Sequence, residues 1–222
     1  MLPAKSGFGN YHIALGYGVR RGDAPSGWTL EDQADHVAAF VRAHAQEPVH
    51  VVGHSIGGAV AVLLVYRHPT LALSLTSVEG NFTLGDAFWS KKISTQALHE
   101  IDAEVSGFRT DVAAWIGRSG VAPTPFALRV ASAWLDHQPI STLRTQARAV
   151  VAATGGPAYL DAVRCILEAG VPLHLVAGAC ARPDWNVPDW VAARAASNVD
   201  IPNTGHLMML ETPQAFADAV LR

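Results

Sequence analysis

The stretch Val49-His50-Val51-Val52-Gly53-His54-Ser55-Ile56-Gly57-Gly58 decides the fold of this chain. The apolar run that ends at Val52 predicts a buried strand, and the apolar residues from Ala59 onward predict a helix that leaves at once. Between them a sharp turn presents Ser55 on a strained backbone, and the small glycines let strand and helix pass closely. The spacing Gly-x-Ser-x-Gly is common on its own, but the strand, the helix and the second glycine together indicate a nucleophilic serine.

Length and charge bound the class of protein. The chain has 222 residues, half of them hydrophobic, and a formal net charge of -3, which suits one domain or one domain with a sizeable insertion. The mild acidity offers no basic surface for nucleic acid or an anionic membrane. Residues 1–7 lack the apolar core of a signal peptide, and the apolar run 71–78 is too short to span a bilayer. We therefore expect a soluble cytoplasmic protein whose partner is a small molecule.

The two cysteines support the same compartment. Cys165 and Cys180 are too few for a disulfide framework and too isolated for a zinc site. A reducing compartment is the default for such a chain.

Short apolar runs alternate with helical patterns, which predicts an α/β protein with a mostly parallel sheet. The predicted strands are 11–15, 49–52, 73–78, 173–177 and 199–201, and the predicted core helices are 29–44, 58–67, 159–168 and 213–221. Thr29 is expected to cap the first helix, with acidic residues in its first turn. Thr212 is expected to cap the last helix, with Pro213 at its first position.

Residues 85–154 differ from the rest of the chain. They show scattered helical stretches, frequent glycine and proline and no convincing strand, so we expect an inserted helical cap between two parts of the core, 1–84 and 155–222. The segment carries Trp89, Trp115 and Trp134. These tryptophans either pack the cap or line an apolar substrate pocket, and the sequence leaves both open.

A serine nucleophile requires a base, and the base requires an acid that orients it. His206 is the candidate base, because it follows the last predicted strand in the loop Pro202-Asn203-Thr204-Gly205 and precedes the last helix. The other nine histidines fit this role less well. His54, for example, occupies the variable position of the Ser55 turn.

The acid has two candidates. Glu79 follows the strand 73–78, at the carboxyl end of the sheet where open α/β folds place their chemistry. Asp184 lies beyond the strand 173–177 and reaches the site only if its loop folds back. We favour Glu79, with Asp184 as the alternative. Each also has a structural explanation, since Glu79 could stabilise the hinge of the cap and Asp184 could cap a turn.

Together these residues resemble the α/β-hydrolase superfamily, in its cap-bearing, esterase-like and dehalogenase-like branch. The resemblance rests on the Ser55 turn, the helical insertion, Gly205-His206 followed by 211–216, and the stretch 14–37 with its Arg21-Gly22-Asp23 segment. It implies the α/β-hydrolase fold. Some members of the branch place the acid after the sixth strand, which favours Glu79. Dehalogenases use an aspartate nucleophile, so a serine at position 55 argues against that activity.

The chain departs from the family at its N-terminus. The family begins with three further strands, and the loop after the third contributes a backbone N–H to the oxyanion hole. We expect this chain to be N-terminally truncated, without that strand and loop. The Ile56 N–H is then the one clear oxyanion donor, and the loss of one donor typically costs about 100- to 1,000-fold in turnover.

The sequence therefore predicts a serine hydrolase that cleaves an ester or similar acyl bond, using Ser55, His206 and Glu79 with the Ile56 amide as oxyanion donor. No metal and no organic cofactor are implied. The apolar cap suggests a modest, largely apolar substrate. One rival is a catalytically silent or truncated relative that binds a ligand under the cap. The other keeps the serine chemistry but cleaves a carbon–carbon bond or a lactone.

Overall fold

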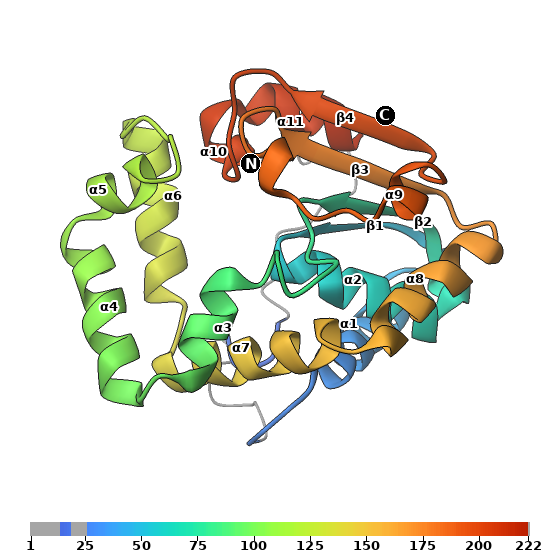
Figure 1. Ribbon diagram of the computed structural model, residues 1–222, viewed down its shortest axis with the longest axis horizontal. Coiled ribbons are helices and arrows are strands. Elements are labelled where there is room, and N and C mark those ends of the chain that lie inside the picture. Colours follow the sequence, from blue (N-terminus) through green and yellow to red (C-terminus); the bar gives the residue numbers. More distant parts are fainter. Residues whose placement is uncertain (1–13, 19–25, 222) are drawn as a thin grey trace.

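The computed structural model describes residues 14–18 and 26–221, and its centre is a parallel sheet (Figure 1). The strands are β1 (Val49–His54), β2 (Ala72–Val78), β3 (Leu173–Gly178) and β4 (Ser197–Ile201). They lie side by side in chain order, each parallel to the next, with Val78 paired to Val176 and Val176 to Val199. All four strands were predicted, and their shared direction gathers their carboxyl ends at one edge of the sheet.

The fifth predicted strand, 11–15, lies mostly outside the described residues. Its last two residues are described, and for them the prediction is wrong. Ala14 and Leu15 begin a turn in which the Tyr17 N–H donates to the Ala14 carbonyl over 3.3 Å. The Leu15 N–H is bonded instead to the buried side chain of Gln33, so it is not available to a strand ladder.

Helices cover both faces of the sheet (Figure 1). On one face lie α1 (Leu30–His44), α2 (Ile56–Arg67) and α8 (Pro157–Glu168), and on the other lie α10 (Met208–Glu211) and α11 (Pro213–Val220). α2 is apolar nearly all round because it is buried between α1, α8 and the sheet. The four predicted core helices are therefore confirmed, and no start or end differs from its prediction by more than two residues.

The two predicted helix caps have opposite outcomes. Thr29 has the extended backbone of a capping residue, with φ -99° and ψ 171°, and forms a capping box with Asp32. Thr212 joins α10 directly to α11 and has φ -136° and ψ 70°. Its N–H donates to the Met208 carbonyl in the last hydrogen bond of α10, and its buried hydroxyl has no hydrogen-bond partner. The side-chain cap predicted at Thr212 is therefore wrong, although Pro213 does occupy the first helical position.

Five helices and no strand occupy residues 85–154: α3 (Phe88–Thr95), α4 (Leu98–Thr110), α5 (Val112–Gly117), α6 (Pro125–Asp136) and α7 (Ile140–Thr154). α3 and α7 pack together through Ile93 and Leu143. Figure 1 shows α4, α5 and α6 on the side of the molecule away from α8, with α3 and α7 joining them to the core. α5 and α6 contact the core at Leu210 of α10. We refer to residues 85–154 as the helical segment.

The remaining short elements are the 3-10 helices Pro69–Leu71 and Arg182–Asp184 and the helix α9 (Asp189–Ala192). Across the described ranges, no single helix combines the length and the apolar composition of a membrane span. The helices α7 and α8 satisfy that criterion jointly, across a bend of 71°.

Candidate active site

The Ser55 turn has the strained geometry that its sequence predicted. Ser55 lies between β1 and α2 with a φ of 53° and a ψ of -125°, a conformation that side-chain-bearing residues rarely adopt. A Cβ atom on Gly53 would lie 2.3 Å from the Gly57 carbonyl oxygen, and one on Gly58 would lie 2.4 Å from the Cα atom of Gly80. The glycines are therefore required by close backbone approach.

Backbone hydrogen bonds fix this turn to the end of β2. The Ser55 N–H donates to the Val78 carbonyl over 3.0 Å, and the Ser55 carbonyl accepts from Gly58 and from Asn81. The Ser55 residue is partly exposed, and its hydroxyl makes no hydrogen bond to a described residue. The hydroxyl is thus presented at the surface of the site by a backbone that is held on both sides.

Glu79 follows β2 directly and is the acid that lies against His206. The carboxylate is buried, with a residue exposure of 6%. One oxygen accepts from the Gly178 N–H over 2.8 Å, and the other lies 2.5 Å from Nδ1 of His206. Because an ionised carboxylate only accepts, Nδ1 carries the proton, and Nε2 of a neutral His206 is free to act as a base.

Asp184, the alternative acid, lies elsewhere. It ends the 3-10 helix Arg182–Asp184, is exposed, and makes no hydrogen bond or ion pair with His206. Its backbone carbonyl accepts from the side chain of Asn186. The structure therefore brings together Glu79 and His206, and leaves Asp184 in a surface turn.

The segment that carries Glu79 is anchored from several sides. Glu79 has a φ of 41°, another left-handed residue at the carboxyl end of a strand. The indole of Trp185 donates to the Gly80 carbonyl over 2.7 Å, and the hydroxyl of Tyr159 donates to the Asn81 carbonyl over 2.8 Å. Burial raises the pKa of the Tyr159 hydroxyl, which keeps it a donor. Glu79 is thus positioned by hydrogen bonds to the backbone of the two residues that follow it.

His206 lies in a tight loop between β4 and α10. The Gly205 N–H donates to the carboxylate of Glu211 over 2.8 Å, and the buried Thr204 hydroxyl donates to the Ile201 carbonyl. Asn203 has a φ of 58°. A Cβ atom on Gly178 would lie 2.3 Å from the Gly205 carbonyl oxygen, so β3 and this loop also approach at backbone distance.

His54 is a site residue that sequence reasoning missed. Its Nε2 atom lies 2.9 Å from the carbonyl oxygen of His206, and the two imidazole rings are 4.5 Å apart. Burial, with a smaller effect of neighbouring His206, lowers the pKa of His54 to about 3, so this ring is neutral. The signal that could have found it was its place next to Ser55 at the end of a strand. The Gly-x-Ser-x-Gly pattern, however, does not specify the residue type at this position.

A cavity of about 340 Å³ lies beside Ser55. Core and helical segment both contribute to its described lining, which comprises Ala14, Tyr17, His54, Ser55, Ile56, Gly57, Trp89, Ser90, Gln138, Leu143, Gln146 and Ala147. Of the three tryptophans considered from the sequence, Trp89 lines this cavity. Trp115 and Trp134 pack around Ile116 in the helical segment.

The Ile56 N–H, the predicted oxyanion donor, is the first amide of α2 and so has no partner inside the helix. The expected lack of a second donor stays a prediction, because no described residue tests it. Within the described ranges, no group of three or more His, Cys, Asp or Glu side chains is placed to hold a metal ion.

Comparisons with known proteins agree with this architecture. The family model described as "Alpha/beta hydrolase family" matches residues 3–219. A crystal structure of a hydrolase from Pseudomonas aeruginosa PA01 superposes with a TM-score of 0.67 and 25% identity, over 94% of this chain and 76% of that one. A Burkholderia cenocepacia protein provisionally described as an aryl esterase gives a TM-score of 0.67 at 19% identity, over 93% and 76% of the two chains.

One group of curated relatives matches over a shorter range. A 65-residue stretch is 37% identical to a protein of Pantoea ananatis (strain LMG 20103) provisionally named carbamate hydrolase RutD. The match covers 29% of this chain and 24% of that protein, so it spans about a quarter of the relative's length. The family model, by contrast, extends over nearly the whole sequence. The chain belongs to the alpha/beta hydrolase family.

Proposed function

We propose that this protein is a serine hydrolase that cleaves an ester or a related acyl bond. The observation that carries the proposal is the buried Glu79 carboxylate held against Nδ1 of His206, at the sheet edge where the strained turn presents Ser55. A serine, an imidazole and a buried acid that orients the imidazole are the groups that activate a hydroxyl for attack.

In the proposed reaction, the Ser55 hydroxyl attacks the substrate carbonyl while Nε2 of His206 removes its proton. Glu79 keeps Nδ1 protonated and stabilises the imidazolium that forms. The Ile56 N–H donates to the oxyanion. His206 then protonates the leaving alcohol, and an acyl group remains on Ser55. Water, deprotonated by His206, attacks this acyl-enzyme, the bond to Ser55 breaks, and His206 returns the proton to the Ser55 oxygen as the acid is released.

In the same proposal, the helical segment acts as a cap over residues 1–84 and 155–222, which form the core. Leu143 and Ala147 of α7 and Trp89 of α3 give the cavity apolar walls, and a volume of about 340 Å³ suits a compact small molecule. The carbamate-hydrolase name of the Pantoea relative makes carbamates a sensible second class of acyl compound to assay. A cytoplasmic location stays a prediction from the composition.

A fluorophosphonate probe tests the serine directly, because an activated serine displaces its fluoride and becomes phosphonylated without requiring a particular substrate. We expect stoichiometric labelling of the native protein, none in Ser55→Ala and hydrolysis of p-nitrophenyl acetate by the native protein only. Ser119→Ala is a suitable control, since Ser119 lies in the loop after α5 and takes no part in the proposed chemistry. Equal labelling of native protein and Ser55→Ala would exclude this function.

A second function is favoured by one observation. The Ser55 hydroxyl makes no hydrogen bond to His206, whereas the Glu79 carboxylate is hydrogen-bonded to Nδ1 of His206. A family member that binds a small molecule in the cavity without turning it over would fit that geometry, whereas an enzyme would close the contact on binding substrate. Saturable binding of an ester, seen by calorimetry and unaccompanied by hydrolysis, would support the silent protein.

If turnover is found, a panel that adds lactones and cleavable β-diketones separates ester cleavage from the other serine reactions.

A further inference from the structure

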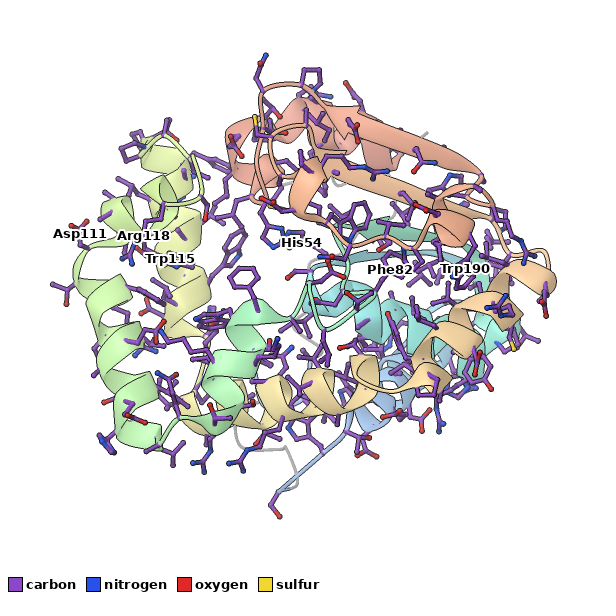
Figure 2. All side chains as sticks on the ribbon, viewed as in Figure 1. His54, Phe82, Asp111, Trp115, Arg118 and Trp190 are labelled. Atoms are coloured by element: carbon purple, nitrogen blue, oxygen red, sulfur yellow. The ribbon has the colours of Figure 1, made fainter. Side chains whose placement is uncertain are left out.

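We propose that His54 is a positioning residue that fixes the His206 loop relative to Ser55, an inference that rests on the function proposed above. Nε2 of His54 lies 2.9 Å from the carbonyl oxygen of His206 itself. Figure 2 shows His54 near the centre of the molecule, where the ends of the strands face the helical segment.

The direction of this hydrogen bond is set by chemistry. A carbonyl oxygen only accepts, so the Nε2 atom of His54 must carry a proton and donate it. Because His54 is neutral, its Nδ1 atom then carries none. His54 therefore has a defined tautomer and cannot itself replace His206 as a base at Nε2.

The position of His54 gives the bond its consequence. His54 is the covalent neighbour of Ser55, and its partner is the backbone of the residue that must take the proton from Ser55. Glu79 orients the ring of His206, and Glu211 holds the preceding amide, but neither side chain is hydrogen-bonded to β1. Among residues 26–221, no other hydrogen bond joins β1 to the loop that carries His206.

The two imidazole rings add a second contact. They are 4.5 Å apart at an angle of 38°, so the side chain of His54 also limits the rotation of the His206 ring. The other hydrogen bonds of the loop, from Glu79, from Glu211 and from the Cys180 N–H to the Thr204 carbonyl, do not reach β1, so without His54 the loop could still shift relative to Ser55. Displacements of about 1 Å between reacting groups can cost on the order of 100-fold in rate.

The test compares variants that differ in the donor. His54→Gln places an amide N–H near the position of Nε2, whereas His54→Leu is of similar size without a donor, and His54→Asn has a donor that is too short to reach. His50→Leu is the matched control, because it removes another imidazole hydrogen bond of β1, the one to Ser74, far from the loop. For each variant we would measure the rate constant of fluorophosphonate labelling, kcat and KM for p-nitrophenyl acetate, and Tm.

We expect labelling and kcat to fall about 100-fold in His54→Leu and His54→Asn. KM should change little, and His54→Gln should recover to within about 3-fold of the native rate. His50→Leu should lower Tm without changing the labelling rate. Native-like labelling in both His54→Leu and His54→Asn, each shown to be folded, or a loss in His54→Gln equal to theirs, would overturn the inference while leaving the proposed function intact. An unlabelled native protein would overturn both.

Discussion

The sheet core and the helical segment differ in how closely their backbones approach one another. In the core, three glycines around the site leave no space for a side chain: Cβ atoms at Gly53, Gly58 and Gly178 would lie 2.3–2.4 Å from other backbone atoms. In the helical segment, Cβ atoms at Gly107 and Gly117 would meet no atom within 4 Å. Close backbone approach thus restricts the sequence at these three core positions, whereas Gly107 and Gly117 have room for a side chain.

This difference separates two tasks of the molecule. Ser55 and Glu79 both adopt positive φ values, and such strain persists only where surrounding structure fixes it. The helical segment holds itself together through ordinary helix packing, as between Ile93 and Leu143, and can change its lining residues without altering the strained turns. We therefore expect chemistry to be governed by the core and substrate choice by the helical segment.

The largest effect is expected at Glu79, the buried acid of the core. Glu79→Gln should lower kcat and the rate of fluorophosphonate labelling by about 1,000- to 10,000-fold, because an amide no longer holds His206 in the productive tautomer. Single-turnover labelling of purified protein measures this loss directly. The matched substitution Asp184→Asn should leave the rate unchanged, since that side chain lies in an exposed turn. A loss confined to Asp184→Asn would reverse the assignment of the acid.

The second-largest effect is expected from Gly58→Ala in the core. The new methyl group would lie 2.4 Å from the Cα atom of Gly80, so α2 and the Glu79 segment must separate. We expect a loss of about 1–3 kcal/mol in the free energy of unfolding, typical of overpacking, and slower labelling because Glu79 is displaced. Urea unfolding followed by circular dichroism provides the energy. Unchanged stability would mean that close approach does not constrain the core.

Gly107→Ala is the corresponding change in the helical segment, within α4. Alanine fills open space there and loses less backbone entropy than glycine, so the variant should be more stable by about 0.5–1 kcal/mol. The same urea titration measures this gain, and the labelling rate should not change. Destabilisation at this position would show that α4 packs more tightly than its surroundings indicate.

Sequence patterns predicted the parts of the molecule in which local rules act alone. The four strands, their helices and the Ser55 turn follow from apolar periodicity and from glycine spacing, which are local properties. The capping box at Thr29 also lies within four residues of chain. The same local rule predicted a side-chain cap at Thr212, and that prediction is wrong. Thr212 also ends α10, and this second role sets its backbone angles.

The acid and His54 required information that spans the chain. The register of β2 against β3, with Val78 beside Val176, places Glu79 next to Gly178 and within reach of His206. The sequence alone could not show that the loop of Asp184 stays in a surface turn, away from His206. His54 meets His206 across 152 positions, and no pattern around either residue encodes that contact.

The smallest effect is expected on the outer surface of the core, where Asp35 of α1 is paired with Arg67 of α2 over 2.7 Å. This pairing, with a contribution from His68, lowers the pKa of Asp35 from 3.8 to about 2. A carboxylate with a depressed pKa stabilises the fold fully above its unfolded value, near pH 4, and loses that contribution as the pH falls through about 2. Both side chains are well exposed, so solvent screening limits the effect to less than about 1 kcal/mol. Asp35→Asn should therefore flatten the fall in unfolding free energy between about pH 4 and pH 2, and leave the labelling rate at neutral pH unchanged. A loss of several kcal/mol in the free energy of unfolding of Asp35→Asn would contradict this expectation. It would show that the outer surface of the core is as sensitive to substitution as the glycines in close backbone contact.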